Sequence, residues 1–318
     1  MNDHDAAAIS AFFSQTDESG TSNAEKAEKL HRIIRRVQST PKDKSYEDVV
    51  DGSEHAADTP IGVVEVDEKF VGLGINILNE DVYPLQSFEI YLRDCDLVGH
   101  LNLSGCVDVV FVDLYRNRLS SIDVANMPSL RILGLQGNEL KALDPTELPA
   151  CQGIDAGMNR IGCIDVSRNP ELVELYINDN CIESLDTSHN PKLKYLRCQN
   201  NKLRKLDTTA NTELRHLYAT GNPLKQIRAL APNHEEALPL ELTADEGGCV
   251  GLSFNPIYNA QWKETGKWEQ SYHAYPDGDF VFAGWYDTDG TCVSREQDWS
   301  DDYGQSRRIV ARFEARNR

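Results

Sequence analysis

Two aspartates and a cysteine are the residues whose types could support catalysis in this sequence. Asp113 and Asp155 occupy equivalent places in two similar segments, which would put their carboxylates roughly 10 Å apart on one sheet face. A glycosidase-like pair could use that spacing. We interpret both as residues of a solvated face. Cys181 has no assigned base, and the chain contains no G-x-S-x-G, H-E-x-x-H or phosphate-binding glycine loop. We therefore predict that the protein is not an enzyme.

Metal and cofactor sites are not indicated either. None of the 8 cysteines forms a C-x-x-C pair, so neither a zinc knuckle nor a thioredoxin-type site is predicted. We expect most of these thiols to be free and reduced. The stretch Asp287-x-Asp289-Gly290 matches the start of a calcium loop, but the remaining ligand spacing is missing. A hairpin turn is the better interpretation, and we predict no metal and no cofactor.

Asparagines at a constant interval form the most specific pattern in the chain. Apolar residues stand at fixed places around each one, as Leu175, Ile177 and Ile182 do around Asn180. One degenerate upstream unit has Cys95 in the asparagine place. Such an interval predicts a solenoid of stacked turns. The six asparagines are spaced by 21 residues: Asn117, Asn138, Asn159, Asn180, Asn201 and Asn222.

The consensus L-x-x-L-x-L-x-x-N-x-L-x-x-L-D resembles the leucine-rich repeat. Its 21-residue unit, with the segments DVSRNPEL and DTSHNPKL, is similar to repeats of bacterial internalin-type surface proteins. The resemblance implies a parallel-β solenoid with a mostly irregular convex side over residues 87–228, in about seven units. A carboxamide both donates and accepts, so each repeated asparagine should bond backbone groups of its own turn and of a neighbouring turn. We call this predicted set the structural ladder.

A different pattern occupies the C-terminal part. We expect a linker at 229–240 and a β-rich domain at 241–318, with turns at Asp277-Gly278 and Asp289-Gly290. We expect Trp285 to lie in its core. The pattern resembles the divergent B-repeat of bacterial surface proteins, a small β-grasp-like module, which implies a spacer or second adhesion unit. The matching residues are Gly247, Gly248, Val250, Ala274, Pro276, Gly278, Phe282, Gly284, Trp285, Tyr286, Gly290, Val293, Ser294, Ala311 and Phe313.

The N-terminal part is polar. Residues 1–60 are expected to be a mostly disordered acidic tail, with one amphipathic helix over 23–38 that could cap the solenoid or dock on a partner. Residues 61–86 are expected to form an N-terminal cap. The helix carries Leu30, Ile33, Ile34 and Val37 at helical spacing.

Charge and hydropathy limit the classes of partner. The formal net charge of −19 argues against nucleic acid, because phosphate recognition needs clustered Lys and Arg. No apolar run reaches the roughly 18 residues of a membrane span, so no membrane insertion is predicted. The first residues do not resemble a secretory signal. Family resemblance favours an extracellular or cell-surface location, whereas the start of the sequence favours the cytoplasm.

The concave face of the solenoid is the candidate binding surface. It is built from residues six, four and two places before each ladder position, whose side chains we expect to point into solvent. Aromatic residues gather there without a structural requirement, and Tyr and Arg dominate binding energy at interfaces. Gly134, Gly153 and Gly157 should leave a small hollow. The candidate residues are Tyr91, Phe111, Asp113, Tyr115, Asp155, Tyr176, Asn178, Tyr195, Arg197, His216 and Tyr218.

Together these features predict a monomeric, non-enzymatic binding protein. Its partner would be a protein, with a glycan as the alternative ligand, in bacterial surface adhesion or host interaction. An intracellular protein–protein interaction scaffold is the alternative function.

Overall fold

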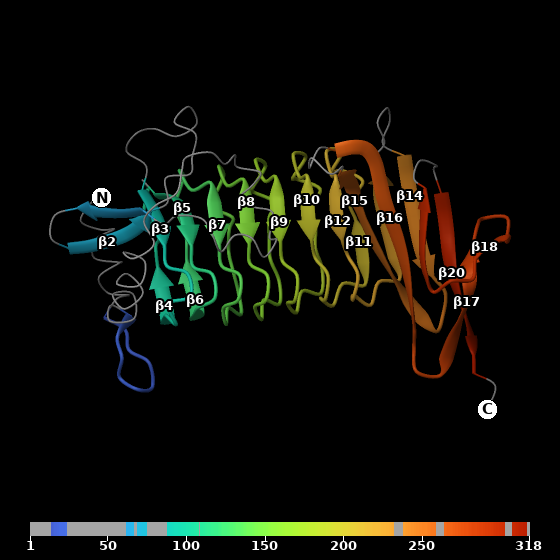
Figure 1. Cartoon of the computed structure of the whole chain (residues 1–318), viewed down its shortest axis with the longest axis horizontal. Coiled ribbons are helices and arrows are strands. Elements are labelled where there is room, and N and C mark those ends of the chain that lie inside the picture. The colour runs from blue at the N-terminus through green and yellow to red at the C-terminus, as the bar shows by residue number, and fades with distance from the viewer. Residues whose placement is uncertain are drawn as a thin grey trace. The chain divides into compact units, whose positions relative to one another are not determined.

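The computed structural model of the chain describes residues 14–23, 62–66, 69–74, 88–107, 109–231, 238–258, 264–302 and 307–316. The chain forms two compact units, Met1–Leu140 and Lys141–Arg318. Both contain turns of a solenoid in which short parallel strands stack side by side (Figure 1). The predicted leucine-rich-repeat solenoid is therefore confirmed.

The first unit holds three concave strands that pair in parallel. Two further strands pair in parallel on the convex side, and an antiparallel pair precedes the repeats. The concave strands are β3 (Phe88–Tyr91), β5 (Val109–Asp113) and β7 (Ile132–Gly134). The convex strands are β4 (Val98–Asn102) and β6 (Arg118–Asp123), and the preceding pair is β1 (Gly62–Val66) and β2 (Lys69–Gly74).

The second unit has four concave strands of the same kind. These pair in parallel and in register, so that equivalent residues of successive repeats lie side by side. They are β8 (Gly153–Asp155), β9 (Glu174–Tyr176), β10 (Tyr195–Arg197) and β12 (His216–Tyr218). The convex side is mostly irregular, and its strands here are β11 (Lys205–Asp207) and β13 (Gln226–Ala231), which pair in parallel.

The predicted structural ladder is present in both units. Asn180 accepts a hydrogen bond on Oδ1 from the Ile161 N–H at 2.9 Å, and donates from Nδ2 to the carbonyl oxygens of Ala156 at 2.9 Å and Ile177 at 3.1 Å. The carboxamide thus joins its own turn to the preceding one. Asn138, Asn201 and Asn222 repeat this arrangement. All six ladder asparagines are buried, as expected for a side chain that replaces water around turning backbone.

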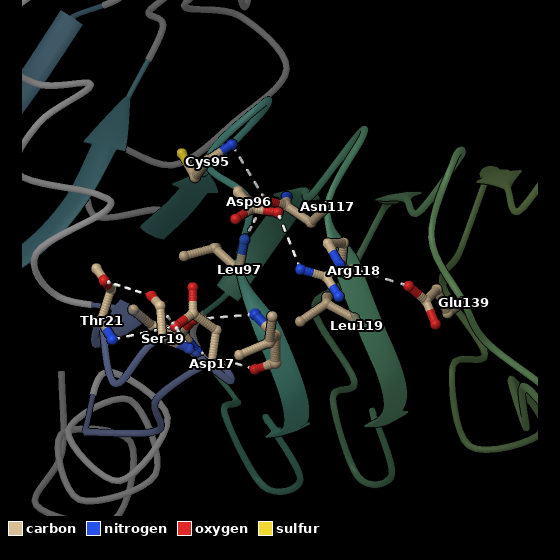
Figure 2. A network of polar contacts seen from close by, with 12 residues as sticks. Asp17, Ser19, Thr21, Cys95, Asp96, Leu97, Asn117, Arg118, Leu119 and Glu139 are labelled. Atoms are coloured by element: carbon tan, nitrogen blue, oxygen red, sulfur yellow. Dashed lines mark hydrogen bonds and ion pairs between the residues drawn. The ribbon is translucent and has the colours of Figure 1, made fainter.

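Cys95 ends the ladder, because its thiol cannot replace the carboxamide. Asn117 Oδ1 makes the usual ladder bond to the Leu97 N–H at 3.0 Å and also accepts the Cys95 N–H at 3.1 Å (Figure 2). On the exposed surface beside it, Arg118 lies 3.7 Å from a carboxylate oxygen of Asp96 and 3.6 Å from one of Glu139.

The residue before each ladder position has a left-handed backbone conformation. This conformation makes the sharp turn that points the carboxamide inward, and it favours glycine. Only two repeats have glycine there. The column comprises Asp94, Arg116, Gly137, Met158, Asp179, Asn200 and Gly221, with φ between 52° and 73°.

A second amide ladder runs along the other side of the second unit, and we did not predict it. Asn190 donates from Nδ2 to the carbonyl oxygens of Val166 and Asn169, both at 2.9 Å. Asn169 and Asn211 make the equivalent pairs of bonds in their own repeats. The same spacing of 21 residues could have revealed these three positions.

The aspartates at the start of the convex segments cap local turns. Asp186 Oδ1 accepts the Ser188 N–H at 2.9 Å, and Asp144 Oδ1 accepts the Thr146 N–H at 3.0 Å and its hydroxyl at 2.6 Å. These hydrogen bonds lower the pKa of both carboxyls, because they stabilise the charged form.

The N-terminal residues 14–23 cover the outer edge of β4. The Asn23 carboxamide accepts from the Val98 N–H and donates to the Val98 carbonyl oxygen, both at 3.0 Å, while Gln15 bonds both backbone groups of His100. Asp17 holds this segment together by accepting bonds from Ser19 and Thr21 (Figure 2). Two carboxamides thus replace a neighbouring strand. The predicted helix 23–38 lies outside the described residues beyond Asn23.

The C-terminal strands extend the two sheets of the second unit. β12 pairs antiparallel with β15, which continues to β16 and β19, while β13 continues through β14 and β20 to β17 and β18. The strands are β14 (Leu238–Ala244), β15 (Gly248–Tyr258), β16 (Glu264–Pro276), β17 (Phe280–Tyr286), β18 (Cys292–Ser294), β19 (Asp298–Asp302) and β20 (Arg307–Ala315).

Large aromatic side chains fill the space between these two sheets. Trp285, Tyr272 and Phe254 are fully buried, and the Tyr272 and Trp299 rings stack with centroids 4.8 Å apart. The prediction that Trp285 is a core residue is confirmed. The predicted linker 229–240 includes the last residues of β13 and the first of β14, and residues 232–237 lie outside the described part of the chain.

Candidate binding surface

Five side chains of the second unit form one continuous cluster on the concave sheet, which we call the aromatic patch. In-register pairing places Arg197 of β10 between Tyr176 of β9 and Tyr218 of β12, and places Tyr195 beside His216. The Arg197 guanidinium carbon lies 4.9 Å from the centroid of the Tyr176 ring and 5.5 Å from that of Tyr218. The Tyr195 and His216 rings stack with centroids 4.3 Å apart. Both contacts orient flat groups on an open sheet.

The expectation that every concave side chain points into solvent is wrong for part of this face. Tyr176 is only 5% exposed and Asn178 only 8% exposed. Strands about 4.8 Å apart bring large side chains into contact, so each covers its neighbour. Burial raises the pKa of Tyr176 far above its ordinary value, with smaller contributions from Glu174. Tyr176 therefore acts as a neutral ring that supports Arg197.

At Gly134 and Gly157, two of the three glycines of the predicted hollow, a neighbouring side chain occupies the space. A Cβ atom at Gly157 would lie 2.9 Å from Asn178 Oδ1, so the missing side chain makes room for that carboxamide. In the first unit, a Cβ atom at Gly134 would lie 3.0 Å from the Tyr115 ring. These glycines allow dense packing along the face, because a polar or aromatic group lies over each backbone.

The first unit carries a separate, self-paired cluster. Asp113 is 1% exposed and forms an ion pair with Arg93, whose guanidinium carbon lies 4.6 Å from the centroid of the Tyr115 ring. Burial raises the pKa of Asp113, while Arg93 acts against that shift. Phe111 is also buried, at 8% exposure. The Asp113 carboxylate is thus paired with Arg93, a residue outside the set of candidates predicted from the sequence. Only the backbone of Tyr91 is described.

Asp155 has a local role in the second unit. It is half-buried and accepts the Gly157 N–H on Oδ1 at 3.2 Å. This bond closes the turn after β8 in the way that Asp113 does for Tyr115 after β5. Both aspartates therefore have a turn-forming contact, and the expectation that Asp113 belongs to a solvated face is wrong because its side chain is buried.

His216 is the residue of the aromatic patch whose titration is shifted away from neutral pH by its surroundings. Burial, together with the charges of Arg197 and Arg215, lowers its pKa to about 4. The imidazole is therefore neutral at pH 7. Its Nε2 atom is buried, as is Gln199 Oε1, and neither atom has a hydrogen-bond partner among the described residues.

The C-terminal strands extend this face with hydroxyl groups, which sequence analysis missed. Tyr218 lies opposite Ser253 of β15, Ser253 opposite Ser271 of β16, and Ser271 opposite Ser300 of β19. The Ser271 and Ser300 hydroxyl oxygens are 2.9 Å apart. Alternation along each strand was visible in the sequence, but the pairing of β15 with β12 was not.

Nucleophilic and metal chemistry find little support in these residues. All eight cysteines are free, and burial raises the pKa of Cys95 and Cys198 to about 12, so both stay protonated thiols. Within the described ranges, no group of three or more His, Cys, Asp or Glu side chains could hold a metal ion. Asp287 accepts the Asp289 and Thr291 N–H groups, which confirms the hairpin turn. No described helix is long and apolar enough to span a membrane.

Comparison with known proteins gives structural neighbours only. No protein-family model and no curated protein matches the chain. The chain is similar to the functional domain of InlJ from Listeria monocytogenes, which includes a cysteine ladder, with 24% identity, a TM-score of 0.33, and coverage of 43% of this chain and 38% of that one. It is also similar to an internalin (inlF) from Listeria monocytogenes str. 4b F2365, with 20% identity, a TM-score of 0.34, and coverage of 42% and 47%. The match spans less than half the length of each neighbour.

Proposed function

We propose that this protein is a non-enzymatic binding protein that recognises another protein through the concave face of its second unit. The observation that carries the proposal is the aromatic patch, in which Arg197 lies between two tyrosine rings beside the stacked Tyr195 and His216. Tyr and Arg are the residues most enriched at binding hot spots. Side chains already held by stacking lose little conformational freedom when a partner binds.

The size of the face favours a protein over a glycan. The sheet of the second unit runs through seven strands in the order β8, β9, β10, β12, β15, β16 and β19. At about 4.8 Å per strand it is roughly 29 Å wide, enough for the 800 Å² or so that each partner buries in a standard interface. The three outer strands present hydroxyls, which suit the polar rim of such an interface.

We also propose bacterial surface adhesion or host interaction as the setting, with an intracellular interaction scaffold as the alternative. Residues 241–318 would be a B-repeat-like module that widens the binding sheet. Two glycines of that motif support this assignment. A Cβ atom at Gly247 would lie 2.3 Å from the Phe280 ring, and one at Gly248 would lie 2.3 Å from the Phe313 ring. Both positions therefore need glycine for the aromatic core to close.

Photocrosslinking from the full chain tests the proposed function. A benzoylphenylalanine replaces Tyr218 on the concave face or, as a matched control, exposed Glu183 on the convex side. We expect a discrete protein adduct from position 218 only, weakened by adding Tyr195→Ala. An adduct whose added mass is removed by glycosidases would support a glycan ligand instead. Equal adducts from both positions, or none from position 218, would contradict the proposal. The cell fraction that contains the adduct, surface or cytoplasm, distinguishes surface adhesion from an intracellular scaffold.

A further inference from the structure

Arg197 is an arginine positioned by two aromatic rings but left without an anion. Its guanidinium carbon lies 4.9 and 5.5 Å from the Tyr176 and Tyr218 ring centroids. No carboxylate among the described residues lies within ion-pair distance of it, and no described group accepts a hydrogen bond from its side chain. The residue is half-buried. A guanidinium has five N–H donors, so a half-buried one with no acceptor is costly unless a ligand or water supplies it.

The first unit shows the same arrangement in a completed form. Arg93 lies over the Tyr115 ring at 4.6 Å, and there the chain supplies its own carboxylate, that of buried Asp113. In the second unit, the residue in register with Arg197 on each side is a tyrosine. The nearest aspartate in that row, Asp155, is two strands away and about 9.6 Å distant across the sheet. The second unit therefore repeats the arginine and the ring without the ion pair; its buried acid, Glu174, is in register with Tyr195 and lies beside Tyr176.

The guanidinium of Arg197 suits a carboxylate attached to a peptide. The nearby His216 Nε2 and Gln199 Oε1 atoms lack hydrogen-bond partners among the described residues, but both are covered by neighbouring groups and do not face a docked partner. A carboxylate would use the planar fork of the guanidinium bidentately, which lysine cannot reproduce.

We propose that Arg197 is the recognition point for an aspartate or glutamate side chain of the protein partner, held between Tyr176 and Tyr218. This inference rests on the proposed function, because it names the partner group that the aromatic patch accepts. The chain's net charge of −19 makes long-range attraction of an acidic partner unfavourable. Recognition therefore depends on the local contact with Arg197, and substitution of other arginines should not weaken it.

A peptide selection on the full chain provides the test. A phage-displayed library of random 12-residue peptides is selected on immobilised wild-type protein, with Tyr195→Ala plus Tyr218→Ala protein as the counter-selection. We expect the recovered peptides to share an Asp or Glu, and Arg197→Gln to weaken their binding at least about tenfold, as loss of a charge-assisted hydrogen bond does. Arg204→Gln, an exposed position with the same change in charge, is the matched control.

A double-mutant cycle then identifies the pair. Replacing the peptide acid with its amide should cost about as much as Arg197→Gln, and the two changes together little more than either alone. Arg197→Lys should restore only part of the affinity. Peptides that need the aromatic patch but carry no acid, or that ignore Arg197→Gln, would overturn this inference and leave the proposed function standing. Failure to recover any peptide that depends on the patch would count against both.

Discussion

The rings of Tyr195 and His216 lie parallel on neighbouring concave strands, with centroids 4.3 Å apart and 15° between their planes. The stack buries the imidazole beside Arg197, and this environment lowers the pKa of His216 to about 4. One aromatic contact therefore links the packing of the candidate binding surface to its response to pH.

The first prediction concerns that response. An unfolded histidine titrates near 6.5, whereas folded His216 titrates at about 4. As the pH falls below about 6.5, His216 binds a proton in the unfolded chain but not in the folded protein. The free energy of unfolding should therefore decrease until about pH 4. The variant His216→Phe keeps the stack but cannot titrate. Urea midpoints measured from pH 7 to 4 should fall more steeply for the wild type, and parallel curves would contradict the assignment.

The second prediction concerns the turn-capping aspartates. The pKa of Asp186 is lowered by the Ser188 N–H and hydroxyl, so its contribution is present above the unfolded pKa of about 3.9 and is lost as the pH falls through the folded value. Asp186→Asn can keep the backbone bond but not the charge. We expect the variant to melt slightly below the wild type at pH 6 and to match it at pH 2. A constant difference in melting temperature would show that the charge is irrelevant.

The third prediction concerns the structural ladder. Asn180→Ala would leave the buried Ile161 N–H without its acceptor and would remove one of two donors from each of three backbone carbonyl oxygens. We expect the free energy of unfolding to drop by roughly 1–3 kcal/mol. Exposed Thr212, which belongs to neither ladder, provides the control, and Thr212→Ala should change little. Equal denaturation midpoints for the two variants would rule out the ladder as a stabilising element.

The fourth prediction concerns the left-handed column. Met158 has φ of 53° and is 56% exposed, so Met158→Gly should relieve backbone strain at small packing cost and stabilise the protein by about 1 kcal/mol. Gly221→Ala should do the reverse, because its φ is 67° and the new Cβ would lie 2.1 Å from Asn200 Oδ1. Differential scanning calorimetry of both variants checks the opposite signs, and two shifts of the same sign would be inconsistent with this column.

What the sequence determined by itself is the solenoid. Each turn contacts only its neighbours, so a constant interval of 21 residues specifies which residues stack, and the burial of Asn117 through Asn222 could be read from that interval. The capping aspartates, the hairpin turn at Asp289-Gly290 and the buried Trp285 depend equally on local pattern. The same interval also contained the ladder of Asn169, Asn190 and Asn211, which sequence analysis overlooked.

Tertiary structure alone decided how the candidate surface is composed. Whether a concave side chain is exposed depends on the sizes of the side chains one strand away, which is why Asp113 and Tyr176 are buried while Tyr218 remains half-exposed. The pairing of β15 with β12 joins residues that no repeat relates, so the extension of the face to Ser253, Ser271 and Ser300 left no trace in the 21-residue pattern. Arg93 has a carboxylate within ion-pair distance, whereas Arg197 has none among the described residues. Both outcomes depend on contacts across strands.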